Sequence, residues 1–307
     1  MLAVAARAGQ VRRRGCSHSS HPPPIAYTGE LSETRAKDQG RILRHPRFPS
    51  RYLSTPRDLV VYLPPGYDPA GAATYPVLYL QDGQNLFDPA TAFAGHDWGA
   101  DIAADRLIAA AAIQPLIMVG IYNAGIRRIS EYTPTKDDRR RKGGKAERYA
   151  KMMARELKPF IDQHYRTRRG PQDTGVGGSS LGGLVSLEAG LRYPRVFGRL
   201  AILSPSVWWH NRSILDLVRA YTADQHARIW IDAGTDEGDS PAQVRSDLEL
   251  LRAALVEQGW REGSDLRCEV VQGAGHNEWA WGARFGDVLQ YLFPLEPERP
   301  ARKGDRQ

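Results

Sequence analysis

The chain has 307 residues, of which 41% are hydrophobic and 25% are charged. These fractions are ordinary for a globular protein, and they exclude a mainly disordered chain, a collagen-like fibre and a coiled coil. No run of about 18 apolar residues is present, which excludes a transmembrane helix. The formal net charge is +7, and such a balance invites a nucleic-acid or anionic-surface partner unless the charge is confined to one segment.

The positive charge is concentrated near the N-terminus. Residues 1–50 hold nine Lys and Arg against three Asp and Glu, a net charge of +6, so residues 51–307 carry only +1. A second basic cluster, at residues 139–145, follows two aspartates and is typical of a solvated loop or the start of a helix. Because the basic balance belongs to one segment, we expect no nucleic-acid partner.

Residues 1–35 are predicted to form a disordered leader, because they are rich in Arg, Ser, His and Pro and show no periodic apolar pattern. The apolar stretch 2–6 precedes the arginines, whereas an export signal places its charges before a longer apolar core. Two cysteines, Cys16 and Cys268, do not make a disulfide framework. These features together indicate a cytoplasmic protein.

Short apolar strands alternate with amphipathic helices from residue 57 onward. Strands are expected at 59–63, 77–80, 116–122, 173–177, 200–203, 227–233 and 266–271, and helices at 145–163, 181–193, 242–258 and 278–293. This alternation predicts a single α/β domain over residues 40–294, with a mostly parallel central sheet and helices on both faces, followed by a tail at 295–307. Active sites in such sheets lie beyond the carboxyl ends of the strands, so the chemistry is expected in the loops that follow them.

The clearest catalytic motif lies between the strand that ends near residue 177 and the helix that begins near residue 181. Residues 178–182 read G-S-S-L-G, the G-x-S-x-G pattern in its required context of strand, sharp turn and helix. The glycines allow the backbone to crowd at the turn, and the helix N-terminus favours developing negative charge. Ser180 is therefore the predicted nucleophile.

A serine hydroxyl needs a base, and in this arrangement an acid and then a histidine follow it in the chain. His276 lies in a loop after the strand 266–271 and is the predicted base, because His226 precedes its strand and His210 follows two tryptophans. The strand 227–233 leads into a loop with three carboxylates, and spacing alone does not choose between them. They are Asp236, Glu237 and Asp239.

An oxyanion hole needs two backbone N–H groups aimed at the developing charge. One is expected from Leu181, the residue after the nucleophile. The other is expected from the loop after the strand 77–80, where Gly83 permits close approach and Gln84 is the chosen donor.

Several segments together resemble the "Putative esterase" family of the α/β-hydrolase superfamily. They are residues 61–67 (VYLPPGY), 80–88 (LQDGQNLFD), 178–183 (GSSLGG), 204–209 (SPSVWW) and 273–276 (GAGH), and the resemblance spans residues 40–294. The family includes esterase D, feruloyl and acetylxylan esterases, mycolyltransferases and ferric-enterobactin-type esterases. The resemblance implies an α/β-hydrolase fold, with Ser180 as nucleophile, His276 as base and Glu237 as acid, and with Asp236 in reserve.

The resemblance also implies where substrate binds. Asn123 and Arg127 follow the strand 116–122 and match a loop near the pocket of similar members. Trp208 and Trp209 are candidate walls of that pocket, suited to sugar or phenolic groups, with packing in the core as the alternative. The loop at residues 82–85 departs from the His-Gly-Gly-Gly sequence of esterase D, so S-formylglutathione hydrolysis is not implied.

These observations predict a serine carboxylesterase that needs no metal or cofactor and acts on a small-molecule ester with a bulky acyl or alcohol part. The bulky part would be an acylated sugar, a feruloyl group or a siderophore. An acyltransferase of the mycolyltransferase type is the main alternative. A binder of anionic surfaces that uses the basic leader ranks below it.

Overall fold

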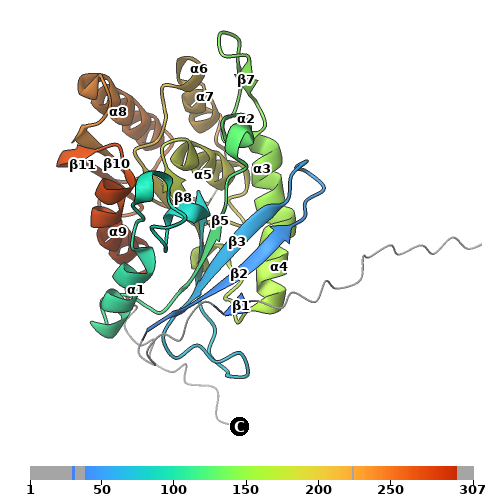
Figure 1. The fold of residues 1–307 in the computed structure, drawn as a ribbon. Coiled ribbons are helices and arrows are strands. Elements are labelled where there is room, and N and C mark those ends of the chain that lie inside the picture. The colour runs from blue at the N-terminus through green and yellow to red at the C-terminus, as the bar shows by residue number, and fades with distance from the viewer. Residues whose placement is uncertain (1–29, 32–38, 223–224, 296–307) are drawn as a thin grey trace, which may run out of the picture.

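The computed structural model describes residues 30–31, 39–222 and 225–295, and a nine-stranded sheet runs through its centre (Figure 1). The order across the sheet is β1-β2-β3-β5-β4-β8-β9-β10-β11. These strands are β1 (Glu30–Leu31), β2 (Arg41–Phe48), β3 (Arg57–Leu63), β4 (Val77–Gln81), β5 (Ile117–Ile121), β8 (Thr174–Ser179), β9 (Arg199–Leu203), β10 (Arg228–Asp236) and β11 (Leu266–Gly275). Strands β5, β4, β8, β9, β10 and β11 pair with one another in parallel. The pairs β1–β2, β2–β3 and β3–β5 are antiparallel.

Helices cover both faces of the sheet (Figure 1). They are α1 (Ala100–Ala109), α2 (Arg128–Glu131), α3 (Ala146–Met152), α4 (Lys158–His164), α5 (Leu181–Arg192), α6 (Trp209–Arg212), α7 (Ile214–Arg219), α8 (Pro241–Glu257) and α9 (Glu278–Leu292). A π-helical turn (Met153–Leu157) joins α3 directly to α4, so the three segments form the single helix that was predicted over 145–163. A small hairpin of β6 (Lys136–Asp137) and β7 (Lys142–Gly143) stands apart from the main sheet.

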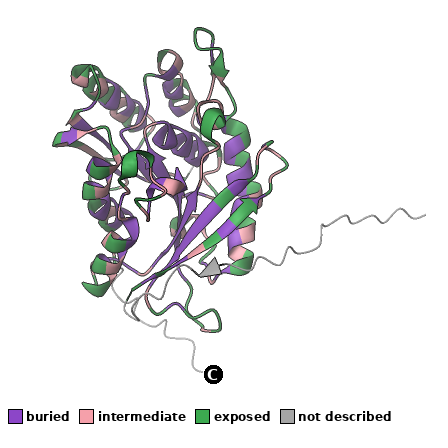
Figure 2. Ribbon diagram, viewed as in Figure 1, coloured by how far each residue is buried: buried purple, intermediate pink, exposed green. Residues whose placement is uncertain are grey.

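Two apolar cores, one on each face, hold the layers together. The strands supply both, because successive side chains of a strand point to opposite faces. In β3, Leu59 and Val61 belong to the core that includes residues of α3, α5, α7 and α8, whereas Val60 and Tyr62 belong to the core that includes residues of α1 and α9. The central strands are buried along their whole length (Figure 2), which explains why they read as continuous apolar runs.

The predicted α/β-hydrolase fold, a single domain with a mostly parallel sheet, is confirmed, and each predicted strand and helix of the body has its counterpart. Several elements were not predicted: the longer β2 and α1, and the short β1, β6, β7, α2, α6 and α7. Strand β2 was missed because its buried side chains, Ile42, His45 and Phe48, do not alternate regularly with exposed ones and Pro46 interrupts it. Helix α1 is only ten residues long and is rich in alanine. Apart from β1 and Leu295, the predicted leader (residues 1–35) and tail (residues 295–307) lie outside the described residues.

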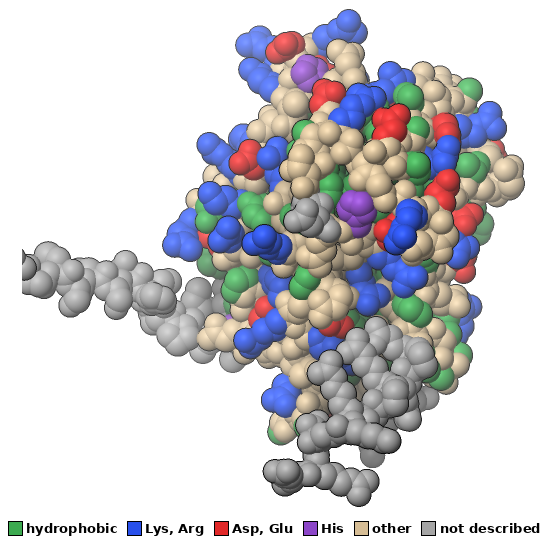
Figure 3. All heavy atoms as spheres, turned by 180° about the vertical axis from the view of Figure 1, so that it is seen from behind, with side chains coloured by type: hydrophobic (Ala, Val, Ile, Leu, Met, Phe, Trp, Pro, Cys, Tyr) green, Lys and Arg blue, Asp and Glu red, His purple; other side chains and the backbone are tan. Residues whose placement is uncertain are grey.

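The carboxyl ends of the parallel strands share one edge of the sheet, and the loops that follow them gather there. The basic cluster at 139–145, predicted as a loop or helix start, lies at the β6–β7 hairpin and the approach to α3. On the face seen from behind, Lys and Arg are spread over the surface with Asp and Glu between them (Figure 3). None of the helices in the described part of the chain has the length and apolarity needed to cross a membrane.

Candidate active site

Ser180 lies on a strained turn between β8 and α5. Its backbone φ of 57° and ψ of −123° are unusual for a residue with a side chain, and such strain is typical of a nucleophile elbow. A Cβ at Gly178 would lie 2.9 Å from Cβ of Gln81, and one at Gly182 would lie 3.0 Å from the same atom. The two glycines of the motif are therefore required by close packing against β4.

Ser180, His276 and Glu237 form a continuous hydrogen-bonded chain. His276 Nε2 lies 2.9 Å from Ser180 Oγ, and His276 Nδ1 lies 2.9 Å from Glu237 Oε2. The three side chains come from the carboxyl ends of β8, β10 and β11, so the parallel sheet brings together residues separated by up to 96 positions. The His276 ring rests edge-on against Trp281, which limits its rotation.

Glu237 is the carboxylate that reaches His276. Its side chain is 1% exposed, and its Oε1 accepts hydrogen bonds from the Ser204 hydroxyl and from the Gly234 N–H. Burial acts to raise the pKa of Glu237, but the hydrogen bonds from His276, Ser204 and Gly234 outweigh it and lower that pKa. The reserve acid Asp236 and the third candidate Asp239 are exposed instead.

The loop after β4, which includes Gln84, lies beside the serine turn. A short 3-10 helix (Gly83–Asn85) follows Asp82, whose φ of 55° is left-handed. The Gln84 carbonyl accepts a hydrogen bond from the Thr91 hydroxyl. A Cβ at Gly83 would lie 2.5 Å from the backbone carbon of Gly120, so only glycine fits there. Leu181 is the first residue of α5, where helix geometry leaves N–H groups without an intrahelical partner.

Asp82 is held by an arginine that the sequence did not single out. Arg128 Nε and Nη2 donate to the two Asp82 carboxylate oxygens at 2.8 and 2.7 Å, and Asn123 Nδ2 donates to Oδ1 at 2.7 Å. The backbone N–H of Asn123 also donates to Gln84 Oε1 at 3.3 Å. Asn123 thus belongs to the site, whereas its predicted companion Arg127 is exposed in the loop beside Arg128.

The two tryptophans predicted as pocket walls differ in burial. Trp209 is buried, and its indole N–H donates to the Thr135 carbonyl at 2.9 Å, whereas Trp208 is 46% exposed. The Arg140 guanidinium lies over both rings, 5.2 Å from Trp208 and 5.8 Å from Trp209. Trp208 is therefore the one of the two with a surface open to a ligand.

Glu278 is a further half-buried carboxylate next to the site, two residues after His276. Its Oε1 accepts a hydrogen bond from Asn85 Nδ2 at 3.0 Å. Burial raises the pKa of Glu278, and the negative charge of Asp82 adds to that shift. Glu278 was not predicted, because an acidic residue in the first turn of a helix has an ordinary structural explanation.

The other two downstream histidines do not reach Ser180 in this structure. His210 Nδ1 lies 2.8 Å from the Thr135 hydroxyl, and His226 stacks on Trp260 with ring centroids 4.4 Å apart. Within the described ranges, no cluster of three or more His, Cys, Asp or Glu side chains is arranged to hold a metal ion.

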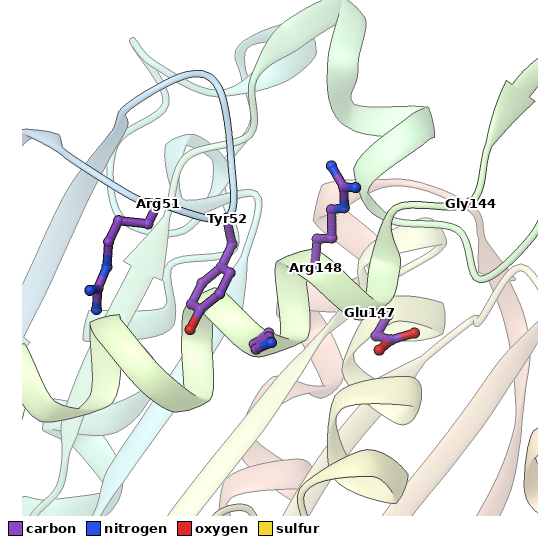
Figure 4. Close-up of a pocket in the computed structure, with 6 residues that line it drawn as sticks. Arg51, Tyr52, Gly144, Glu147 and Arg148 are labelled. Atoms are coloured by element: carbon purple, nitrogen blue, oxygen red, sulfur yellow. The ribbon is translucent and has the colours of Figure 1, made fainter.

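A separate hollow of about 550 Å³ lies between the loop before β3 and the start of α3 (Figure 4). Its walls are Arg51, Tyr52, Gly144, Glu147, Arg148 and Lys151. The Lys151 ammonium lies 5.0 Å from the centre of the Tyr52 ring, and Arg51 is paired with Glu156. None of these residues contacts the chain of Ser180, His276 and Glu237, so the hollow is not part of the candidate active site.

A family model described as "Putative esterase" matches residues 50–292. An endo-1,4-β-xylanase/feruloyl esterase of Xylanibacter ruminicola is 28% identical over 76% of this chain and 29% of its own length. An iron(III) enterobactin esterase of Dickeya dadantii is 45% identical over 49% of this chain and 35% of its own. This chain therefore spans about a third of each of these relatives.

A solved structure, the siderophore hydrolase EstA of Aspergillus nidulans, superposes with a TM-score of 0.63 over 85% of this chain and 95% of that one. The two sequences are 20% identical. At this identity the likeness concerns the fold, and it agrees with the sheet and helices described above.

Proposed function

The chain belongs to the "Putative esterase" family and is a carboxylic ester hydrolase, and from this premise we propose that it works through an acyl-enzyme on Ser180. The observation that carries the proposal is the chain of two 2.9 Å contacts from Ser180 Oγ through His276 to Glu237. Ser180, Glu237 and His276 follow one another in the order nucleophile, acid and base that is typical of α/β-hydrolases, and each lies just after a parallel strand.

In the acylation step, His276 Nε2 takes the proton of Ser180 as its Oγ attacks the ester carbonyl. The backbone N–H groups of Leu181 and Gln84 stabilise the oxyanion that forms, and the α5 dipole adds to this. His276 then passes the proton to the departing alcohol. Glu237 holds the imidazole with its proton on Nδ1 and stabilises the imidazolium.

In the second step a water molecule attacks the acyl-enzyme. His276 takes a proton from that water, the tetrahedral intermediate collapses, and the proton returns to Ser180 Oγ as the acid is released. The enzyme ends each turnover in its starting protonation state.

The substrate we propose is an ester with a bulky acyl or alcohol part, of the feruloyl, acylated-sugar or siderophore type. The relatives named above act on feruloyl esters and on iron(III) enterobactin. The exposed ring of Trp208 and the polar side chains of Asn123 and Glu278 suit a substrate that has both aromatic and hydrogen-bonding groups. A panel of short acyl, feruloyl, acetylated-sugar and trilactone esters ranks these classes, and an added sugar acceptor separates hydrolysis from acyl transfer.

The decisive experiment is the variant Ser180→Ala, assayed with p-nitrophenyl acetate. We expect kcat/KM to fall by roughly 10⁴-fold or more, because the covalent route is lost. The neighbouring Ser179→Ala is the matched control and should change kcat/KM only a few-fold. A fluorophosphonate should label the wild-type protein once, at Ser180. Unimpaired hydrolysis by Ser180→Ala would refute the proposed nucleophile.

A further inference from the structure

A second buried carboxylate, Asp232, lies behind the proposed acid, and an arginine lies between them. Asp232 is in β10 with its side chain fully buried, and Arg284 is in α9 with 5% of its side chain exposed. Arg284 Nη2 lies 3.7 Å from Glu237 Oε1. One guanidinium therefore faces two carboxylates in a space that water hardly reaches, where charges interact strongly.

The guanidinium of Arg284 is bonded through all three of its nitrogens. Nε and Nη2 donate to the two oxygens of Asp232 at 3.1 and 2.9 Å, and Nη1 donates to the Ala280 carbonyl at 2.9 Å. Nη2 also donates to Ser204 Oγ at 2.8 Å. This network fixes the position of Arg284 on one side of Ser204.

Ser204 links this pair to Glu237. Its backbone is held in a left-handed conformation with φ of 42°, and its N–H donates to Asp232 Oδ1 at 3.1 Å. Its hydroxyl oxygen lies within hydrogen-bond distance of three groups: Arg284 Nη2, the Trp281 indole N–H at 2.9 Å, and Glu237 Oε1.

The direction of the Ser204 hydrogen bond follows from chemistry. A hydroxyl has one proton and two lone pairs. Arg284 and Trp281 can only donate, so they occupy the two lone pairs of Ser204 Oγ. The single hydroxyl proton is left for Glu237 Oε1, and Glu237 Oε2 is left for His276 Nδ1.

From this arrangement we infer that Arg284 is a positioning residue for Glu237. It balances the charge of Asp232 and holds Ser204 as a donor to Oε1, so that Glu237 stays ionised with its other oxygen turned toward His276. The inference rests on the proposed function, because it concerns the acid of that triad. The polar or charged groups that face Glu237 are Ser204 from the end of β9, Asp232 and the Gly234 N–H from β10, His276 from the end of β11 and Arg284 from α9.

The test is the pH dependence of kcat/KM in the double variant Arg284→Met/Asp232→Leu. Both charges are removed together, because a buried pair can often be replaced by apolar residues, whereas removal of one partner leaves the other unpaired. We expect kcat/KM to fall roughly 10- to 100-fold, with kcat changed more than KM. The acid limb of the pH profile should move to higher pH, because without Arg284 the Ser204 hydroxyl is no longer held as a donor to Glu237 Oε1. Glu237 then becomes more basic, and the Glu237–His276 pair takes up its proton at a higher pH.

The matched control is Arg57→Met/Glu131→Leu, which removes another buried ion pair, one whose side chains are 1% and 4% exposed. Its unfolding transition will shift, but its acid limb should coincide with that of the wild type. A folded Arg284→Met/Asp232→Leu protein with the wild-type acid limb would overturn the inference and leave Arg284 as a purely structural residue.

Ser204→Ala keeps the inference testable should the double variant not fold, because it removes only the donor hydroxyl. We expect its acid limb to move in the same direction, with a loss in kcat/KM of roughly 10-fold. A wild-type profile in Ser204→Ala would refute the role of the hydroxyl. These failures are distinct from that of the proposed function, which falls only if Ser180→Ala remains active.

Discussion

Two aspartate–arginine pairs border the candidate site, and they differ in their access to water. The pair of Asp232 and Arg284, behind Glu237, has side chains that are 0% and 5% exposed. The pair of Asp82 and Arg128, in the loops after β4 and β5, has side chains that are 8% and 26% exposed. In both pairs the guanidinium donates two hydrogen bonds to one carboxylate, so the bonding is alike and the surroundings are not.

The difference assigns the two pairs different tasks. In the buried pair each charge depends on the other, because neither can be hydrated, and loss of one strongly destabilises the fold. In the partly solvated pair water can replace much of the lost interaction. Its main effect is instead on shape, because Arg128 and Asn123 hold Asp82 in the left-handed conformation from which Gly83 and Gln84 continue. Asp232→Leu, Arg128→Met and Glu237→Gln test this comparison, and Trp208→Ala tests a residue outside both pairs.

The largest effect is expected for Asp232→Leu with Arg284 left in place. The buried arginine loses both hydrogen bonds to its carboxylate and keeps only the Glu237 carboxylate at 3.7 Å, so the free energy of unfolding should drop by about 3–5 kcal/mol. Urea unfolding followed by circular dichroism measures this change. A loss below about 1 kcal/mol would mean that water reaches Arg284, and the contrast between the two pairs would disappear.

Arg128→Met should lower activity strongly and the free energy of unfolding only slightly. We expect kcat to fall roughly 10- to 100-fold, because the loop of Gly83 and Gln84, in which we propose the oxyanion donor, loses the arginine that holds Asp82 in place. The free energy of unfolding should fall by about 1 kcal/mol, as for a partly solvated pair. Arg127→Met is the matched control, since it removes the adjacent exposed arginine, and it should leave kcat within about two-fold. Equal losses of kcat in Arg128→Met and Arg127→Met would contradict the role of Arg128 in holding Asp82.

Glu237→Gln tests the electrostatics of the buried side through pH. The pKa of Glu237 is lowered by folding from its ordinary value of 4.5, so its ionised form stabilises the protein above that pH, and this contribution is lost as the pH falls through the folded-state pKa. The wild type should therefore be more stable than Glu237→Gln at pH 7, and the difference should shrink toward pH 3. A difference that is independent of pH would argue against an ionised Glu237.

The smallest effect is expected for Trp208→Ala. Its ring is half exposed, so the free energy of unfolding should change by less than about 0.5 kcal/mol. If the ring contacts the bulky part of the substrate, KM for an aromatic ester should rise several-fold while KM for p-nitrophenyl acetate stays the same. Identical KM changes for both esters would exclude a contact with the bulky part.

Much of this protein could be predicted from local patterns in the chain. The alternation of apolar strands and amphipathic helices predicted the sheet, because burial on both faces leaves a continuous apolar run that does not depend on distant residues. The G-x-S-x-G turn at Ser180 could also be predicted from a local pattern, because its glycines are required by the sharp turn that they themselves form. His276 followed from its place at the end of a strand.

The remaining features depended on contacts across the fold. Spacing did not separate the three carboxylates after β10, and only the family resemblance favoured Glu237. In the structure Glu237 lies 2.9 Å from His276, whereas Asp236 and Asp239 are exposed. Arg128 lies 46 residues from Asp82 and Arg284 lies 52 from Asp232, so no local pattern marks either pair. The sequence by itself determined the layers, the serine turn and the histidine. Only the tertiary structure decided which arginines join them and how Glu237 is held against His276, because burial and the direction of the Ser204 hydrogen bond arise where β9, β10 and α9 meet.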